Sequence, residues 1–374
     1  MSKLEELIAK YCPDGVEFKR LEDISCMQRG TSITRNNFDS GEIPVISGGK
    51  TPSFYCNISN RDADIITVAG SGAGAGYVQY WNIPIFVNDA FSVKANEGNL
   101  TKYLYYFLNN IQEKIYQTKK GGGVPHVHIS CISKFLIPIP PIEVQQEIVR
   151  ILDNFTELTA ELTAELTARR KQYEYYFKDV FTMFKSPIVK LGDIGTVKMC
   201  KRILKSQTSS VGDIPFYKIG TFGKQPDAYI SRETYEAYCQ KYSHPKKGDI
   251  LISCSGTIGR TVIYDGEPAY FQDSNIVWLE HDGSKVTNEY LRFAYMTNPW
   301  VISTGGTISR LYNDGILQAE IPLPTLEQQK QIVDILNRFD TLCNDLTQGL
   351  PAEIEARKKQ YEYYRDKLLT FKEL

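Results

Sequence analysis

The chain has 374 residues, with 43 basic and 44 acidic side chains and a formal net charge of −1. This length predicts two or three domains. The balanced charge excludes a generally basic nucleic-acid-coating protein, so any DNA binding must come from local patches. No apolar run approaches the roughly 18 residues of a membrane span, and the amphipathic N-terminus lacks the apolar core of a secretion signal. The eight cysteines form no C-x-x-C pair, which argues against a zinc ribbon and fits a reducing cytoplasm.

The first 141 residues alternate short apolar runs with Gly, Pro, Asn and Asp. This texture is typical of mixed α and β structure with many strands and loops. Residues 65–69 and 83–87 are predicted strands, and residues 101–116 are the predicted helix that stands out.

A long helix is predicted over 142–184. A proline cluster just before it marks its start. Its apolar residues, from Phe155 to Phe184, recur every three or four positions, except for one step of seven across Arg169. Such spacing is typical of a coiled-coil seam. If continuous, the helix would be roughly 65 Å long at about 1.5 Å per residue.

The rest of the chain repeats this order. Residues 250–254 and 275–279 are predicted strands, and 287–296 is a predicted helix. A second long helix follows at the C-terminal end, and Gly349 and Pro351 predict a kink or break in it.

An internal duplication decides the architecture. The hexapeptide K-Q-Y-E-Y-Y occurs at 171–176 and again at 359–364, and residues 137–155 match residues 321–339 at an offset of 184 positions. The second copy carries 14 more residues in its early part, since the R-L-E-D-I at 20–24 aligns with the K-L-G-D-I at 190–194, 170 positions later, whereas the offset further along the chain is 184. We therefore expect an α+β (mixed α/β) protein. It has two similar globular domains, separated by a pair of long antiparallel coiled-coil helices with pseudo-two-fold symmetry.

Two similar modules on a rigid spacer suit a ligand that repeats at a distance, as double-stranded DNA does. The order of domain, helix, domain, helix resembles the specificity subunit of a type I restriction–modification system. Paired I-P-x-P helix starts, paired A-R-x-K-Q-Y-E-Y-Y segments and paired L-x-D-I and G-x-I-P entries carry this resemblance, which covers the whole chain. It implies target-recognition domains over 1–141 and 186–324, a central helix over 142–185 and a C-terminal helix over 325–374.

The resemblance also implies what the protein does. It would be a non-catalytic, cytoplasmic subunit that recognises a bipartite, asymmetric site in double-stranded DNA, one domain to each half-site. It would bind no cofactor. Two methyltransferase subunits would use S-adenosylmethionine, and restriction subunits would use ATP and Mg. The residues alone leave two alternatives open: a coiled-coil scaffold with duplicated peptide- or glycan-binding domains, and an autonomous methyltransferase.

The central helix contains two complete T-A-E-L units, at 159–162 and 163–166. Four residues add about 6 Å of rise and about 400° of turn, whereas one base pair adds about 3.4 Å and about 34–36°. The rotational phases therefore match for one added base pair, although the rise is closer to two. The resemblance implies that the number of T-A-E-L units sets the length of the spacer between the half-sites. The structural alternative is that this segment is simply a patch of residues with good helix propensity.

Motifs for catalysis are incomplete. A phosphate-binding loop ending at Gly49 and Lys50 needs glycine where Pro44 stands. The glycines from Gly70 to Gly76 do not form G-x-G-x-x-G. Asn298-Pro299-Trp300 lacks the second proline of an adenine methyltransferase motif, so a helix stop explains it better.

DNA contacts need Arg, Lys, Asn, Gln, Ser or Thr on loops that approach closely. The glycine loops have a structural explanation as tight turns, and the basic groups have one as solvated charges. The candidate DNA-binding residues are Arg29, Thr31, Arg35, Lys50, Ser71, Gly72, Lys119, Lys120, His126, Lys198, Lys201, Arg202, Lys224, Ser255, Thr257, Arg260 and Arg310. The candidate partner-subunit contacts, for which packing in the seam is the alternative, are Tyr173, Tyr176, Tyr361 and Tyr364.

Overall fold

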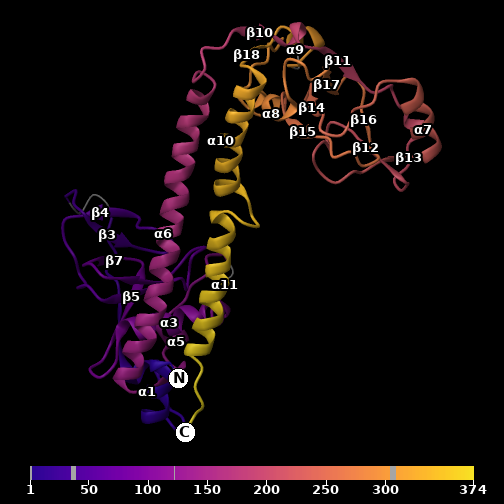
Figure 1. Ribbon diagram of the computed structural model, residues 1–374. Coiled ribbons are helices and arrows are strands. Elements are labelled where there is room, and N and C mark those ends of the chain that lie inside the picture. The colour runs from indigo at the N-terminus through magenta and orange to yellow at the C-terminus, as the bar shows by residue number, and fades with distance from the viewer. Residues whose placement is uncertain (1, 35–38, 122, 304–308) are drawn as a thin grey trace. The chain divides into compact units, whose positions relative to one another are not determined.

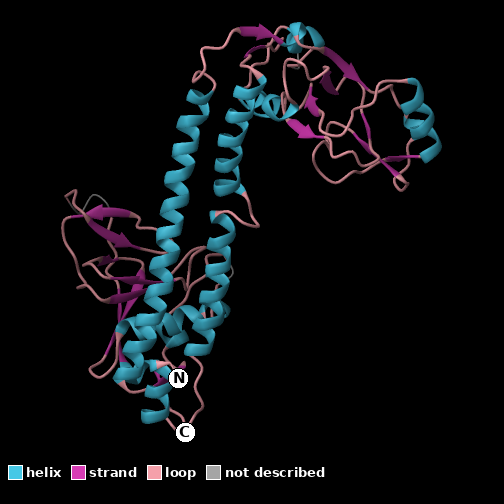
Figure 2. Cartoon of the chain, viewed as in Figure 1, coloured by secondary structure: helices cyan, strands magenta, loops and turns pink. Residues whose placement is uncertain are grey.

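The computed structural model describes residues 2–34, 39–121, 123–303 and 309–374. It divides into two compact units. Unit 1 comprises Met1–Ala164 with Ala352–Leu374, and unit 2 comprises Glu165–Pro351. Figures 1 and 2 show that each unit contains sheets, short helices and segments of the long helices.

Unit 1 contains three small sheets. The largest is antiparallel with strand order β2-β8-β5-β6, a second has the order β4-β3-β7 with β3 parallel to β7, and the third pairs β1 with β9. The strands are β1 (Glu17–Arg20), β2 (Ser25–Arg29), β3 (Ile43–Ile46), β4 (Phe54–Cys56), β5 (Ile65–Ala69), β6 (Val78–Trp81), β7 (Phe86–Val87), β8 (Ala90–Ala95) and β9 (Leu136–Ile139).

Helices cover these sheets and extend from them. They are α1 (Lys3–Tyr11), α2 (Leu21–Ile24), α3 (Thr101–Asn110), α4 (Gln112–Gln117), α5 (Ile129–Ile132), the first part of α6 (Ile142–Val180) and most of α11 (Leu350–Leu368). All five residues of β5 are buried, which explains its continuous apolar run. The predicted helix over 101–116 is interrupted at Ile111, so it is two helices rather than one.

Unit 2 repeats the sheet topology of unit 1. Its sheets have the orders β11-β17-β14-β15, β13-β12-β16 and β10-β18, and β12 is parallel to β16. The strands are β10 (Ile188–Lys190), β11 (Thr196–Met199), β12 (Ile214–Tyr217), β13 (Tyr229–Ile230), β14 (Ile250–Ser253), β15 (Thr261–Ile263), β16 (Tyr270–Phe271), β17 (Ile276–Glu280) and β18 (Glu320–Pro322). The duplication inferred from the sequence is thus a duplication of strand order.

The helices of unit 2 are α7 (Arg232–Lys241), α8 (Asn288–Met296), α9 (Asn313–Leu317), α10 (Leu326–Asn344) and the second part of α6. Two short 3-10 turns, Leu191–Asp193 and Lys205–Gln207, complete it. α10 begins at a capping box, in which the Thr325 hydroxyl accepts from Gln328 N and Gln328 returns a bond to Thr325 N. The helical path is interrupted between Asn344 and Leu350, which confirms the break expected before Pro351.

One buried glutamine in each unit joins the start of a long helix to the domain beside it. Gln145 Nε2 donates to Pro140 O (2.8 Å) and Asn99 Oδ1 (3.1 Å), while its Oε1 accepts from Leu100 N (3.0 Å). Gln329, 184 positions later, donates to Pro324 O (2.9 Å) and Lys285 O (2.8 Å) and accepts from Thr287 N (3.0 Å). Both side chains are fully buried. We call this arrangement, which each unit contains once, the glutamine clamp.

The apolar stripe of the long helices forms a seam inside each unit. In unit 1, Phe155 of α6 stacks on Tyr364 of α11, with ring centroids 5.4 Å apart. In unit 2, Phe339 of α10 stacks on Tyr173 of α6 at 5.9 Å. The T-A-E-L segment lies within α6, which is helical from Ile142 to Val180 and ends four residues before the predicted Phe184.

Among the helices of the described ranges, none is long and apolar enough to cross a bilayer. All eight cysteines are free thiols.

Candidate functional site

A polar cleft of about 530 Å³ lies in unit 2, where the chain leaves β11 and β16. Four cationic side chains and two amides contribute to its lining: Arg202, Lys205, Lys218, Arg310, Gln272 and Asn275. Asp273, also in the lining, is paired with Arg202 (2.9 Å). The lining therefore carries more positive than negative charge, and its amides offer hydrogen-bond donors and acceptors. This combination suits a polyanion that also presents polar edges.

A smaller cleft of about 260 Å³ occupies the equivalent place in unit 1. Arg29 and Gly30 at the end of β2 line it, together with Asn88 and Asp89 before β8. Asn88 and Gln272 are 184 positions apart and act alike. Asn88 Oδ1 accepts from Ile33 N (2.9 Å), and Gln272 Oε1 accepts from Ile219 N (3.0 Å). In each unit an amide at this position fixes a neighbouring loop.

Several of the predicted residues of unit 1 meet beside this cleft. The Ser71 hydroxyl is hydrogen bonded to the Asp89 carboxylate. The backbone of Ser71 is also bridged to His126, and His126 is bridged in turn to Lys120. Arg29, Ser71, Gly72, Lys120 and His126 therefore belong to one surface.

A glycine is required where two of these loops touch. A Cβ on Gly48 would collide with Ser71 O, so the loop that carries Lys50 packs directly on the loop that carries Ser71 and Gly72. Lys50 itself is exposed, with its ammonium over the Tyr77 ring. The turns pack against each other, as their structural explanation requires, and they lie beside the cleft; their contact with DNA stays a prediction.

Other predicted residues lie around the two clefts rather than in them. Thr31 is exposed just beyond β2, Lys119 lies over the Tyr116 ring, and Arg35 falls outside the described residues.

In unit 2, only Arg202 and Arg310 of the predicted set line the cleft. Ser255 is joined to it through Asn275 Oδ1 (2.8 Å), and Thr257 is exposed on the same loop as Ser255.

Four predicted cations of unit 2 have contacts outside the cleft lining. Lys198 pairs with Glu280 (3.6 Å) across the sheet, and Lys201 lies over the Tyr242 ring. Arg260 donates to Gly223 O (3.3 Å), and Lys224 lines a separate hollow near Tyr264.

Sequence reasoning missed two kinds of residue. Lys218, Gln272 and Asn275 line the unit 2 cleft although no motif marks them. In unit 1, Arg61 donates to Arg29 O (2.9 Å) and to Ser92 Oγ (2.7 Å), and so holds the end of β2 in place. The offset of 184 positions links Gln272 to Asn88, but only the fold shows that both lie at a cleft.

The tyrosines of the two K-Q-Y-E-Y-Y segments have unequal surroundings. Tyr173 is half-buried between Phe177 and Phe339, and burial raises its pKa to about 12. Tyr361 is also half-buried, and burial likewise raises its pKa to about 12. Tyr364 stacks on Phe155 and Tyr176 on Phe339, although Tyr176 remains 47% exposed.

The middle tyrosines point outward instead. Tyr175 is 66% exposed and Tyr363 is 63% exposed, and they occupy equivalent positions, 188 residues apart. Tyr175 and Tyr363 were not among the predicted partner contacts, because a heptad pattern cannot tell which of three neighbouring aromatic residues faces the seam.

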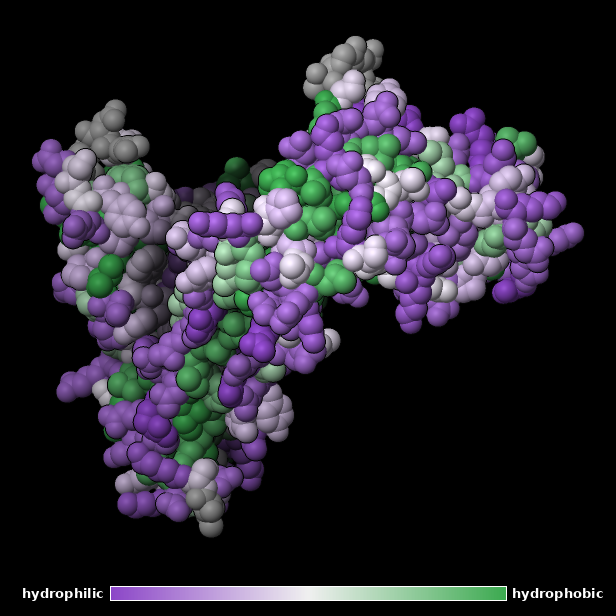
Figure 3. Space-filling model, turned by 45° about the horizontal axis from the view of Figure 1, so that its top comes forward, coloured by the Kyte–Doolittle hydropathy of each residue, from purple (hydrophilic) through white to green (hydrophobic). Residues whose placement is uncertain are grey.

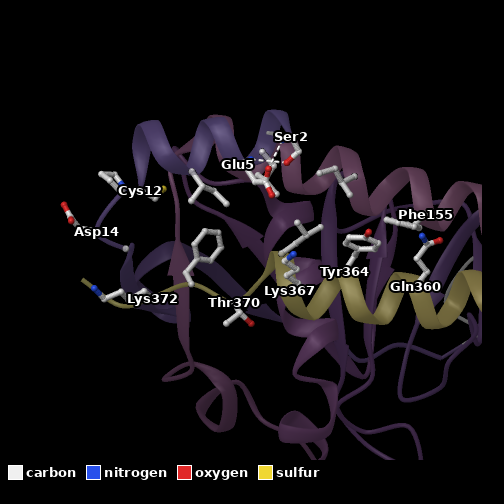
Figure 4. A pocket seen from close by; sticks show the side chains of 17 residues that line it. Ser2, Glu5, Cys12, Asp14, Phe155, Gln360, Tyr364, Lys367, Thr370 and Lys372 are labelled. Carbon is white, nitrogen blue, oxygen red and sulfur yellow. Dashed lines mark hydrogen bonds between the residues drawn. The ribbon is translucent and has the colours of Figure 1, made fainter.

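An apolar cavity of about 560 Å³ lies in unit 1 between α1, α6 and α11. Leu4 and Ile8 of α1 and Leu368 of α11 line it, together with Tyr364 and with charged side chains such as Glu5 and Lys367 (Figure 4). Figure 3 shows that hydrophilic side chains cover most of the face in view, with hydrophobic ones gathered into stripes and patches between them.

One ion cluster joins α1 to α6. The Glu147 carboxylate is only 3% exposed and accepts from Arg150 Nη2 (2.6 Å) and Lys3 Nζ (2.9 Å). Hydrogen bonds from Arg150 and then from Lys3 hold the pKa of Glu147 at about 2, against an ordinary 4.5. α1 precedes the duplicated L-x-D-I segment of the first copy, and position 331, the equivalent of Glu147 in unit 2, is an exposed glutamine.

The profile of the type I restriction modification DNA specificity domain matches the chain twice, over residues 13–169 and 185–356. The chain belongs to this family. A Haemophilus influenzae protein named as a type I restriction enzyme specificity subunit is 46% identical over 371 residues, covering 95% of this chain and 96% of that protein. An Escherichia coli type I restriction enzyme specificity subunit is 31% identical over 412 residues, covering 99% and 97%.

Solved structures have the same fold as this specificity-family chain. The S subunit of a type I restriction–modification system from M. genitalium superposes with a TM-score of 0.61 at 16% identity, covering 96% of this chain and 97% of that chain. The HsdS subunit of Thermoanaerobacter tengcongensis gives a TM-score of 0.55 at 17% identity, covering 96% and 97%. The resemblance inferred from the paired motifs is confirmed, and so is the duplicated α and β fold.

Proposed function

We propose that this specificity-family chain recognises a bipartite, asymmetric site in double-stranded DNA, with the cleft of each unit contacting one half-site. The observation that carries the proposal is the duplicated cleft, built at the same strand ends in both units and cationic in unit 2. Phosphate contacts need cations, and base edges need amides, hydroxyls and guanidinium groups. The unit 2 cleft contains all of these groups.

The two half-sites should differ, because the two clefts differ. Both linings contain an aspartate at the same repeat position, Asp89 and Asp273, but unit 2 presents four cations around its amides, whereas Arg29 is the cation in the lining of unit 1. Arg favours guanine edges and Asp favours the cytosine amino group. Equivalent loops with different side chains therefore yield two different base preferences on one scaffold.

The T-A-E-L units of α6 act as the spacer in this proposal. They lie inside a single helix of 39 residues, so an added unit would lengthen it by about 6 Å. Leu162 and Leu166 are half-buried, whereas Ala160, Glu161, Ala164 and Glu165 are exposed. Four added residues repeat this pattern with a phase change of about 40° beyond a full turn.

The chemistry belongs to partners in this proposal. Two methyltransferase subunits would transfer the methyl group of S-adenosylmethionine to adenine, and restriction subunits would use ATP and Mg. The chain itself would act in the cytoplasm without a cofactor. The family, together with the incomplete catalytic motifs at Pro44 and at Asn298-Pro299-Trp300, supports this assignment.

Methylation mapping by single-molecule sequencing tests the proposal directly. Cells that carry the chain with its neighbouring methyltransferase gene are compared with cells that lack only the chain. We expect a split, asymmetric motif with methyladenine in each half, lost on deletion. Unchanged methylation, together with purified-complex binding to duplex DNA that does not weaken as salt rises, would favour the scaffold alternative.

The spacer is tested by inserting one T-A-E-L unit after Leu166. Both half-sites should stay the same, and the gap between them should lengthen by one base pair. A matched control inserts four residues after Gly283, in an exposed turn of unit 2, and should leave the gap unchanged. An unchanged gap in the T-A-E-L variant would contradict the spacer role of these units.

A further inference from the structure

Two planar side chains stack at the same repeat position in both units. In unit 1, the rings of His126 and His128 lie parallel, 1° apart in plane, with centroids 6.0 Å apart. In unit 2, the Arg310 guanidinium lies 5.8 Å from the centroid of the Tyr312 ring. Each residue of one pair stands 184 positions from its counterpart in the other. We call them the stacked pairs.

The backbone presents both pairs in the same way. The residue between the members is buried in each case, since Val127 and Leu311 are each 1% exposed. Val127 N donates to Gly70 O (3.0 Å), and Leu311 N donates to Cys254 O (2.9 Å). Because alternate side chains of an extended segment point to opposite faces, an anchored middle residue directs both neighbours outward.

Each pair stands beside the cleft of its own unit. Arg310 lines the unit 2 cleft and donates to Ser274 O (2.7 Å), which uses one of the five N–H groups of a guanidinium. Tyr312, 57% exposed, supports the face of the guanidinium. In unit 1, His126 is bridged to Ser71, whose hydroxyl contacts Asp89 in the cleft lining.

We infer that the stacked pairs are specificity-determining elements, through which Arg310 selects a guanine in one half-site and His126 contacts a different base edge in the other. This inference rests on the proposed DNA-binding function. A guanidinium can donate two parallel hydrogen bonds to guanine O6 and N7, whereas an imidazole offers one donor or one acceptor on each nitrogen. The neighbouring aromatic ring, 6.0 Å from the His126 ring in unit 1 and 5.8 Å from the Arg310 guanidinium in unit 2, restricts how the contacting group can turn.

An exchange of the pairs tests this inference. One variant carries His126→Arg and His128→Tyr in unit 1; the reciprocal variant carries Arg310→His and Tyr312→His in unit 2. Each is expressed with the partner methyltransferase, and the methylated motif is mapped. The first should gain a guanine preference at one position of one half-site, and the second should lose a guanine preference at one position of the other half-site.

Arg310→Lys keeps the positive charge and guards against loss of folding. Binding of its purified methyltransferase complex to duplexes that vary one base pair at a time should show a loss of about ten- to hundred-fold discrimination at a single position. Discrimination elsewhere should stay within two-fold of wild type. Lys241→Ala, exposed at the end of α7, is the matched control and should keep every preference.

The outcomes separate the two levels of the hypothesis. If wild-type methylation depends on the chain but both exchange variants and Arg310→Lys keep the wild-type motif, the stacked pairs are structural and the inference is wrong. Discrimination that falls equally at every position would overturn it too. If wild-type methylation does not depend on the chain at all, the proposed function itself fails.

Discussion

Units 1 and 2 share their scaffold and differ in what surrounds it. Both contain the same three sheets, the same glutamine clamp and a tyrosine hydroxyl that donates to a proline carbonyl: Tyr103 to Pro138 O (2.9 Å) and Tyr290 to Pro322 O (2.7 Å). Within the described residues, unit 1 alone has α1 with its ion cluster at Glu147, and unit 2 alone has α7 and a cation-rich cleft. The buried hydrogen bonds are thus duplicated, whereas the helices and charged side chains at the surface differ between the units.

The glutamine clamp should show the largest effect, and a similar one in both units. Gln145→Leu and Gln329→Leu each leave a buried backbone N–H and carbonyl oxygens without their partner, at about 1–3 kcal/mol for each unsatisfied group. We expect a loss of about 3–5 kcal/mol in the unfolding free energy of the altered unit, measured by hydrogen exchange of its amides.

The exposed neighbours Gln146 and Gln331 are the matched controls for the clamp. Their leucine variants should change stability by less than about 0.5 kcal/mol, as surface substitutions generally do. Clamp variants that lose less than about 1 kcal/mol would contradict the clamp, and unequal losses in the two units would show that the duplicated hydrogen bonds are not energetically equivalent.

The sequence predicted the shared scaffold well, because repeated residues imply repeated contacts. The offset of 184 positions aligned Gln145 with Gln329 before either was seen to be buried, and the break before Pro351 followed from backbone chemistry. The clefts were harder to predict. Lys218, just after β12, and Asn275, just before β17, come together from separate loops, and their proximity depends on tertiary packing rather than on spacing along the chain. The interruption at Ile111 also escaped periodicity, since α3 and α4 preserve an apolar pattern across it.

The second prediction concerns the ion cluster of unit 1 that joins α1 to α6. Glu147→Gln removes a carboxylate whose pKa is held at about 2 by Arg150 and Lys3. A shift from 4.5 to about 2 corresponds to roughly 3 kcal/mol, and exposure of the two cations (56% and 68%) reduces this to about 1–2 kcal/mol at pH 7. The unfolding free energy of unit 1 should fall by that amount.

The pH dependence fixes the sign of this contribution. Because the folded pKa lies below the unfolded one, the stabilisation is fully present above about pH 5 and is lost as the pH falls toward 2. The difference between wild type and Glu147→Gln should therefore shrink between pH 5 and pH 3. A difference that stays constant over this interval would show that α1 is held by its apolar contacts alone. Gln331→Ala in unit 2 should show no such dependence.

The third prediction compares the ion pairs that join a domain helix to a long helix. Lys102 pairs with Asp153 in unit 1 (2.8 Å), and Arg292 pairs with Asp340 in unit 2 (2.7 Å). All four side chains are about one third exposed, so double-mutant cycles should give coupling energies of about 0.5–1 kcal/mol in each unit. High salt should reduce both values.

Asp153→Asn should nevertheless cost more than Asp340→Asn. Asp153 also accepts a hydrogen bond from the hydroxyl of buried Tyr106, whereas the second contact of Asp340 is with the exposed Asn344. Equal costs would mean that the Tyr106 hydroxyl finds a compensating partner, and Tyr106→Phe in the Asp153→Asn background would then remove that hydrogen bond and lower stability by about 1 kcal/mol.

The smallest effect on stability is expected at Tyr175 and Tyr363, the exposed tyrosines that the two K-Q-Y-E-Y-Y segments share. Their serine variants should change the unfolding free energy by less than about 0.5 kcal/mol, because both rings are almost two thirds exposed. If the methyltransferase subunits contact these segments, as proposed, each variant should weaken assembly about ten-fold or more, as the loss of an interfacial tyrosine often does.

Sedimentation of the reconstituted complex measures assembly with the methyltransferase subunits and shows whether Tyr175 and Tyr363 have the same role in the two units. Equal weakening by Tyr175→Ser and Tyr363→Ser would place one partner on each unit through the duplicated scaffold. Weakening by only one of them would assign partner binding to the parts that differ, with α1 and the apolar cavity beside it as the first region of unit 1 to alter. Undiminished assembly in both variants would remove these tyrosines from the interface, because their loss would then have left partner binding unchanged.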